Sequence, residues 1–118
     1  PIPGPSAILT ALMASGLPTD KFIFLGYLPK SQGKRQRILR HFGQLPATLI
    51  FFESPYRLLR SLADVKEVFG DIEAVVCQEL TKLFEGIRRG KISDLIKYFE
   101  STKPRGEFTV LVSPAKKS

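Results

Sequence analysis

The chain has 118 residues, enough for one compact domain, and 43% of them are hydrophobic, so a core can be buried. It has no apolar run long enough to span a membrane. A single cysteine, Cys77, excludes an internal disulfide and fits a reducing, cytoplasmic setting. One Cys and one His are too few for a zinc site, so we expect no metal. The net charge of +7 favours a polyanionic partner.

Gly and Pro punctuate a regular alternation of elements along the first half of the chain. Hydrophobic periodicity and β-propensity predict, in order, a helix over 6–15, a strand over 22–25, a loop over 29–33, a basic helix over 34–42 and a strand over 48–52. The helix 6–15 is expected to stop at Gly16. The strand over 48–52 has the clearest signal because it is both β-branched and aromatic.

The second half continues the alternation. Ser54 is expected to cap a helix that has Pro55 at its first position and runs to about Phe69. The remaining predictions are a strand over 74–77, a weaker strand over 84–89, a helix over 92–99 and a closing strand over 108–112. This order predicts an α/β domain over 1–114 with a mixed sheet of about five strands and flanking helices. The tail 115–118 is expected to be disordered.

Positive charge is concentrated in one stretch. No acidic residue occurs between Asp20 and Glu53, whereas the same stretch holds Lys21, Lys30, Lys34, Arg35, Arg37 and Arg40. Helical spacing puts most of these cations away from the apolar side of the helix, with Arg35 nearest to that side. The stretch is predicted to contact RNA phosphates through Lys30, Lys34, Arg35, Arg37 and Arg40. The alternative is a solvated basic face without a ligand.

Two segments have the character of ligand contacts. Residues 3–7, Pro-Gly-Pro-Ser-Ala, form a tight turn before a helix whose free backbone N–H groups point at the turn. The alternative is an ordinary helix start. Glu53 ends a hydrophobic strand, the position at which open α/β sheets bind ligands, and its carboxylate could accept hydrogen bonds from ribose hydroxyls. The alternative for Glu53 is a cap or an ion pair with Arg57.

Other polar positions have a simpler interpretation. Glu79, Lys82 and Glu85 follow a predicted strand and form either a site or a salt-bridged surface. His41 is expected to be solvated, and Cys77 is expected to be a small core residue. The chain has no sequence motif of a nucleophile elbow, a phosphate-binding loop or a dinucleotide-binding site. Sequence motifs therefore do not identify a catalytic residue.

Short segments spread over nearly the whole chain resemble the C-terminal domain of the tetrapyrrole methylase superfamily. Within it, the similarity is to enzymes that methylate a cytidine ribose 2′-hydroxyl in small-subunit ribosomal RNA. The segments occur in the family's order: Pro3-Gly4-Pro5-Ser6-Ala7, Ser15-Gly16-Leu17-Pro18-Thr19-Asp20, Gly26-Tyr27-Leu28-Pro29, Leu49-Ile50-Phe51-Phe52-Glu53-Ser54-Pro55-Tyr56-Arg57, Glu79-Leu80-Thr81-Lys82, Arg89-Gly90 and Arg105-Gly106-Glu107-Phe108. Tyr56 departs from the family, which usually has His there, as do Phe84-Glu85-Gly86, where it has His-Glu-Glu.

The resemblance implies a two-domain enzyme with S-adenosyl-L-methionine in the cleft between the domains. The N-terminal domain is not part of this chain, which begins with Pro rather than Met. Carried over residue by residue, the cofactor contacts are Ser6, Ala7, Glu53 and Leu80. The implied partners are small-subunit ribosomal RNA or the assembled small subunit, and a second copy in a homodimer. The isolated chain is expected to fold but to be inactive, because half of the cleft is missing.

The implied reaction transfers a methyl group from a sulfonium to a ribose oxygen, and some group must take the hydroxyl proton. No residue of this chain is assigned to that step. Two alternatives remain: the same fold with another acceptor, such as a tetrapyrrole or a protein, and a non-catalytic basic RNA-binding module. The run of family segments argues against the second. The acid-free basic stretch favours RNA over a tetrapyrrole, since phosphates attract Lys and Arg.

Overall fold

A computed structural model of the chain describes residues 4–79 and 84–114. The helices and strands follow one another in the order that the sequence predicts. In chain order they are α1 (Gly4–Ser15), β1 (Phe22–Tyr27), α2 (Gln32–Gly43), β2 (Thr48–Glu53), α3 (Leu58–Phe69), β3 (Glu73–Glu79), β4 (Phe84–Lys91), α4 (Ile92–Ser101) and β5 (Glu107–Val112). The predicted tail, 115–118, lies outside the described residues.

The strands form one mixed sheet in the order β1-β2-β5-β3-β4. β1 and β2 are parallel, and the other pairs are antiparallel. The last strand along the chain, β5, is inserted between β2 and β3, so that the two halves of the chain share one sheet. The predicted fold class is confirmed.

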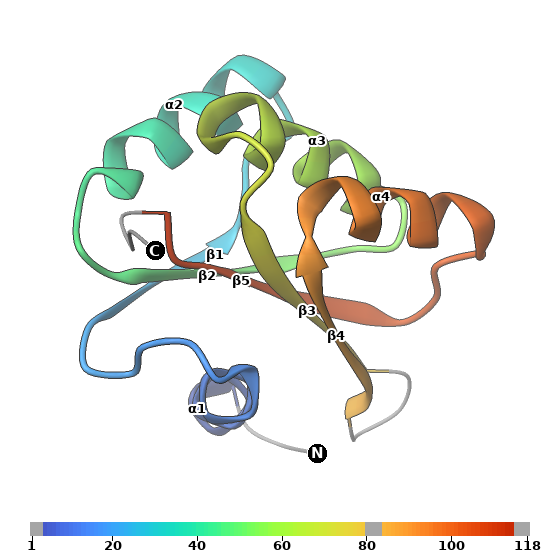
Figure 1. Ribbon diagram of the computed structural model, residues 1–118, viewed down its shortest axis with the longest axis horizontal. Coiled ribbons are helices and arrows are strands. Elements are labelled where there is room, and N and C mark those ends of the chain that lie inside the picture. Colours follow the sequence, from blue (N-terminus) through green and yellow to red (C-terminus); the bar gives the residue numbers. More distant parts are fainter. Residues whose placement is uncertain (1–3, 80–83, 115–118) are drawn as a thin grey trace.

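The sheet is covered unequally on its two faces. Figure 1 shows α2, α3 and α4 side by side on one face, and α1 alone on the other. The larger core lies between the sheet and the three helices, and includes Leu39, Phe51, Leu62 and Val110. A smaller core lies between α1 and the middle strands. We refer to the two faces as the three-helix face and the α1 face.

Three predicted helix starts differ from the structure, and the first is α1, which begins at Gly4 rather than at residue 6. α2 begins at Gln32, because the Ser31 hydroxyl accepts a hydrogen bond from the Lys34 backbone N–H at 3.4 Å and caps the helix two residues early. The prediction that Ser54 caps α3 is wrong, since that helix begins at Leu58 after a turn. The Ser54 backbone N–H donates to the side chain of Glu53 instead.

A glycine changes the course of β1. Gly26 has a φ of +68°, in the left-handed region that glycine tolerates best. The pairing with β2 shifts there, from Phe24↔Ile50 to Tyr27↔Phe52, so that β1 contains one extra residue. Such a β-bulge re-aims the side chains that follow it. Tyr27 consequently lies on the same face of the sheet as Phe24, which regular alternation would not allow.

None of the helices in the described part of the chain is long and apolar enough to cross a membrane.

Candidate functional site

One end of the sheet collects several of the segments that carry the family resemblance. The parallel strands β1 and β2 both finish there, at Tyr27 and Glu53. β5 starts at this end, because Phe108 pairs with Glu53, and β3 finishes at it, because Glu79 pairs with Glu107. Ligands of open α/β sheets bind beyond the carboxyl ends of parallel strands. This end of the sheet is therefore the candidate site.

The structure locates only part of the set carried over for the cofactor. Ser6 and Ala7 lie in the first turn of α1, and their side chains are outside the description. Leu80 is outside the described residues, although its chain neighbour Glu79 ends β3 at the candidate site. Glu53 is fully described. The cofactor role of the four residues stays a prediction.

The carboxylate of Glu53 is held inside the protein. Its side chain points to the three-helix face, as does Phe51 two residues earlier, and Glu53 is only 1% exposed. Oε1 accepts a hydrogen bond from the Ser54 backbone N–H at 3.0 Å and lies 3.8 Å from Nε of Arg57. Oε2 accepts a hydrogen bond from the hydroxyl of Ser61 on α3. The ion pair with Arg57, offered by the sequence as an alternative, is thus present.

A second carboxylate at this end is exposed. The Tyr27 hydroxyl donates a hydrogen bond of 2.7 Å to Oε1 of Glu107, the first residue of β5. To do so the Tyr27 side chain crosses β2, which lies between the two strands. The hydrogen bond to Glu107, followed by partial burial and by the negative charges of Glu107 and Glu53, raises the pKa of Tyr27 to about 12. The Tyr27 hydroxyl therefore stays protonated, and donates to Glu107, up to pH values above its ordinary pKa of 10.0.

An aromatic cluster lies beneath this hydrogen bond on the α1 face. The ring of Phe52 lies 4.9 Å from that of Phe24 and 5.6 Å from that of Tyr27, both edge-on. Phe24 is 41% exposed and Tyr27 is 53% exposed. Tyr27 and Glu107 belong to segments that resemble the family, but no pattern in the sequence predicted a role for them. The Gly26-Tyr27 pair was the available signal, because glycine inside a strand indicates a bulge.

Most of the basic residues predicted to contact RNA are exposed. Lys30 lies in the loop after β1, and Lys34, Arg37 and Arg40 lie on the solvent side of α2. Arg40 makes a weak hydrogen bond of 3.4 Å to Gln36 on its own helix. These four positions are therefore available to a ligand.

Arg35 corrects that prediction. Its side chain is 6% exposed, and its Nε lies 2.5 Å from Oδ2 of Asp64 on α3. Nη1 of Arg35 also donates to the backbone carbonyls of Pro29 and Lys30. The absence of acids between residues 21 and 52 did not reveal this pairing, because the counter-charge comes from another helix. Arg35 fixes the loop that precedes α2 and is not free to bind phosphate.

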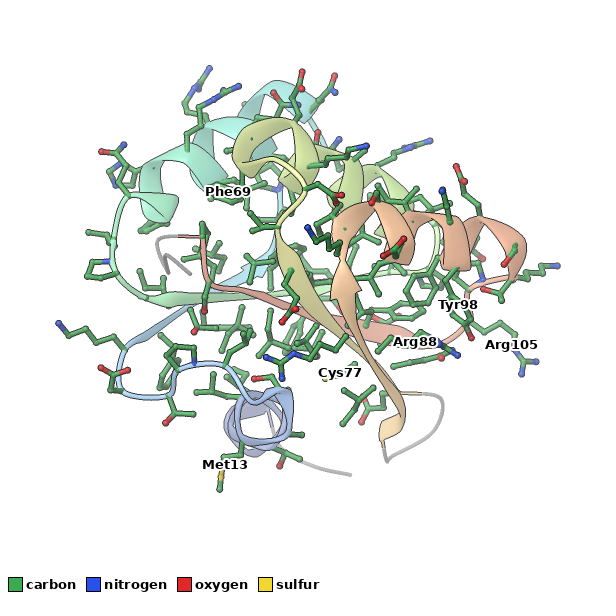
Figure 2. The ribbon with its side chains drawn as sticks, in the orientation of Figure 1. Met13, Phe69, Cys77, Arg88, Tyr98 and Arg105 are labelled. Atoms are coloured by element: carbon green, nitrogen blue, oxygen red, sulfur yellow. The ribbon has the colours of Figure 1, made fainter. Side chains whose placement is uncertain are left out.

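Further cations lie along β4, at the opposite edge of the sheet from β1. Figure 2 shows Arg88 against Tyr98 of α4, and the guanidinium carbon lies 3.4 Å from the centre of the ring. Arg89, on the other face, donates to the Ser15 carbonyl at 2.9 Å and to Glu73 at 3.0 Å. Neither arginine was predicted to be a site residue. They bind neighbouring elements of the fold, which indicates a structural role.

The predictions for Cys77 and His41 agree with the structure, whereas a third prediction is not tested. Cys77 is fully buried in the smaller core, as expected, and burial raises the pKa of its thiol to about 11. His41 is exposed at the end of α2. Lys82 lies outside the described residues and the side chain of Glu85 is not described, so their cluster with Glu79 is untested. Within residues 4–79 and 84–114 no group of three or more potential metal ligands occurs.

The chain matches a known protein family over most of its length. The family model for tetrapyrrole (corrin/porphyrin) methylases matches residues 1–96. The chain belongs to this family. A crystal structure of the methyltransferase CobJ has a similar fold, with a TM-score of 0.65 over 96% of this chain and 50% of that one, at 20% sequence identity. The family and the fold that the sequence segments predicted are thus confirmed.

Curated members of the family with closer sequences share one name. A "Ribosomal RNA small subunit methyltransferase I" from Thermotoga maritima is 46% identical over 112 residues, covering 95% of this chain and 50% of that protein. Proteins of the same name from Mesorhizobium japonicum and Pseudomonas aeruginosa are 50% and 48% identical over 117 residues, covering 98% and 96% of this chain. The match covers 40% and 41% of the length of those two proteins. The chain therefore spans half or less of the relatives it matches.

Proposed function

We propose that this chain is the C-terminal domain of an S-adenosylmethionine-dependent methyltransferase that methylates a cytidine ribose 2′-hydroxyl in small-subunit ribosomal RNA. The observation that carries the proposal is the 46–50% identity, over nearly the whole chain, to proteins named ribosomal RNA small subunit methyltransferase I. Membership of a methylase family supports the reaction type. We further propose a cytoplasmic homodimer as the working form.

The cofactor would supply the methyl group, so the protein has to bind it and align the acceptor oxygen. Ser6, Ala7, Glu53 and Leu80 are the residues that we propose to line its site. Of these, Glu53 has its carboxylate occupied by Ser54, Ser61 and Arg57 and turned away from the α1 face. Its proposed contact therefore rests on its position at the end of β2, and the carboxylate itself is assigned a structural role.

The exposed cations support RNA as the acceptor. Lys30, Lys34, Arg37 and Arg40 project from α2 and the loop before it, and that loop follows the end of β1 at the candidate site. Four cations on one surface suit the repeated negative charge of a ribose-phosphate backbone better than a single small acceptor. Such contacts position RNA without reading its sequence.

Methyl transfer to isolated substrates tests the proposal. The full-length protein is incubated with labelled S-adenosylmethionine and small ribosomal subunits from a strain that lacks the enzyme, and the RNA is digested to nucleosides. We expect the label in 2′-O-methylcytidine. Label in a tetrapyrrole or a protein, and none in RNA, would contradict the proposal. The 118-residue chain alone is the control, and it is expected to transfer nothing because half of the cofactor cleft is absent.

A further inference from the structure

Part of the α1 face is left open. The helix α1 packs over Ile50, Val75, Cys77 and Leu111, which belong to the middle strands. It leaves uncovered the aromatic side chains on the same face of β1, including Phe24 and Tyr27, although large hydrophobic residues are usually buried. The uncovered region adjoins the end of the sheet at which β1 and β2 finish.

The bulge at Gly26 builds this surface. Without the extra residue, regular alternation would turn Tyr27 toward the three-helix face. The positive φ of Gly26 and the register shift bring Tyr27 opposite Phe52 on the α1 face instead. β-Bulges are rare between parallel strands and frequent next to functional sites. A conformation that only glycine adopts readily is thus used to place one tyrosine.

The surface combines flat rings with a hydrogen-bond acceptor. Phe52 is half-buried and supports Phe24 and Tyr27 at ring distances of 4.9 and 5.6 Å. Glu107 is exposed, and the Tyr27 hydroxyl occupies one of the roughly four lone-pair sites of its carboxylate. The remaining sites can accept hydrogen bonds from a ligand hydroxyl. Exposed rings beside a hydroxyl acceptor match the two parts of a ribonucleoside, its base and its ribose.

We propose that Phe24, Tyr27, Phe52 and Glu107 form a nucleotide-binding surface, on which an unpaired base of the RNA substrate stacks and Glu107 accepts a hydrogen bond from a ribose 2′-hydroxyl. The proposal rests on the proposed function and adds where the RNA is held. Charge supports RNA as the occupant: Lys30 follows Tyr27 by three residues, Arg105 precedes Glu107 by two, and both are exposed. Both cations lie on segments that adjoin the surface, and cations there can contact the phosphates of a bound RNA strand.

Binding of a short single-stranded RNA to variants of the full-length protein tests the surface. Tyr27→Ala is expected to weaken RNA binding about tenfold or more, the usual effect of losing one stacking aromatic. Tyr27→Phe keeps the ring and should bind nearly as well as the wild type. Phe24→Ala should also weaken RNA binding, and Phe22→Ala is its matched control. Phe22 lies on the same strand with the same 41% exposure as Phe24, but at the far end of β1 from the site.

Glu107→Gln provides a second, conservative test. The wild type is expected to prefer the RNA over DNA of the same sequence, because only RNA offers a 2′-hydroxyl. The variant keeps one acceptor oxygen in place of the two of the carboxylate, so it should lose part of that preference. Its melting temperature should stay close to that of the wild type, since Glu107 is exposed and the amide oxygen can still accept from Tyr27. This variant keeps the proposal testable even if Tyr27→Ala fails to fold.

The outcomes separate this proposal from the proposed function. Unchanged RNA affinity in Tyr27→Ala and unchanged selectivity in Glu107→Gln would overturn the surface and leave the methyltransferase proposal standing. If Tyr27→Ala or Glu107→Gln loses S-adenosylhomocysteine binding but still binds RNA, the surface belongs to the cofactor site. If either variant changes the molecular mass measured by light scattering, the surface contacts a second copy of the protein. Either result overturns the proposal. A wild-type protein that does not bind the short RNA would overturn this surface, and the methyltransferase proposal would still be decided by methyl transfer to small ribosomal subunits.

Discussion

Arg35 on α2 and Asp64 on α3 form a buried ion pair, with Nε and Oδ2 only 2.5 Å apart and side chains 6% and 2% exposed. Asp64 also accepts a hydrogen bond of 3.0 Å from Gln36, and Arg35 donates to two carbonyls of the loop before α2. The pair therefore links two helices and holds the loop that bears Lys30.

Removing one member of this pair should destabilise the protein strongly. Asp64→Leu leaves the Arg35 charge buried without its partner, and we expect the free energy of unfolding to fall by ~3–5 kcal/mol. The double variant Arg35→Met, Asp64→Leu should lose much less. Urea denaturation measures both. The control is Glu73→Gln, which breaks an exposed pair with Arg89 (side chains 57% and 45% exposed) and should cost less than about 1 kcal/mol. If Asp64→Leu and Glu73→Gln lower the free energy of unfolding by the same amount, the structural role of Asp64 is contradicted.

The exposed cations of α2 should act on RNA binding through charge alone. Replacing both Arg37 and Arg40 with Ala is expected to reduce the salt slope of RNA binding by about two, one for each lost phosphate contact. Filter binding over a series of salt concentrations measures the slope, and cofactor affinity should not change. Lys97→Ala, which removes an exposed cation on α4, is the control. An unchanged slope would show that the basic stretch is only a solvated face.

Tyr27 should give the protein a distinct alkaline titration. The pKa of Tyr27 in the folded state is about 12, above the ordinary value of 10.0, because Glu107 accepts the hydrogen bond of the protonated hydroxyl. This contribution to stability is present in full below pH 10 and is lost as the pH rises toward 12. Absorbance at alkaline pH should show a component with a pKa of about 12 that is absent in Tyr27→Phe. If both proteins titrate identically, the hydrogen bond to Glu107 does not form in solution.

The sequence predicted what depends on neighbours in the chain. Periodicity predicted the order of the helices and strands along the chain, and several of the family segments lie together at one end of the sheet. The order of strands could not be predicted, because β5 pairs with β2 across more than fifty residues and periodicity does not specify partners. The same reason explains Arg35: helical spacing placed it near the apolar side, but its partner Asp64 lies on another helix.

Local signals also competed at the site itself. Ser54-Pro55 has the sequence of a helix start, yet the buried carboxylate of Glu53 binds the Ser54 N–H and a turn precedes α3. In β1, regular alternation would turn Tyr27 toward the three-helix face. The register shift at Gly26 places it on the α1 face instead. Both differences arise from backbone conformation at the candidate site. Propensity is least informative where the backbone departs from regular geometry.

Variants of Glu53 and Ser61 separate the two roles considered for Glu53. Ser61→Ala removes the hydroxyl that donates to Oε2, and leaves a buried carboxylate with one partner fewer. The free energy of unfolding should fall by ~1–3 kcal/mol, the cost of an unsatisfied buried polar group, and Glu53→Gln should lower it as well. Because the carboxylate faces α3, the affinity of the folded full-length protein for S-adenosylhomocysteine should change less than twofold, which calorimetry can measure.

Ser93→Ala, which removes an exposed serine–carboxylate hydrogen bond to Asp71, is the control and should lower the free energy of unfolding less than Ser61→Ala does. A large loss of cofactor affinity in Glu53→Gln at unchanged stability would instead place the carboxylate in the cofactor site.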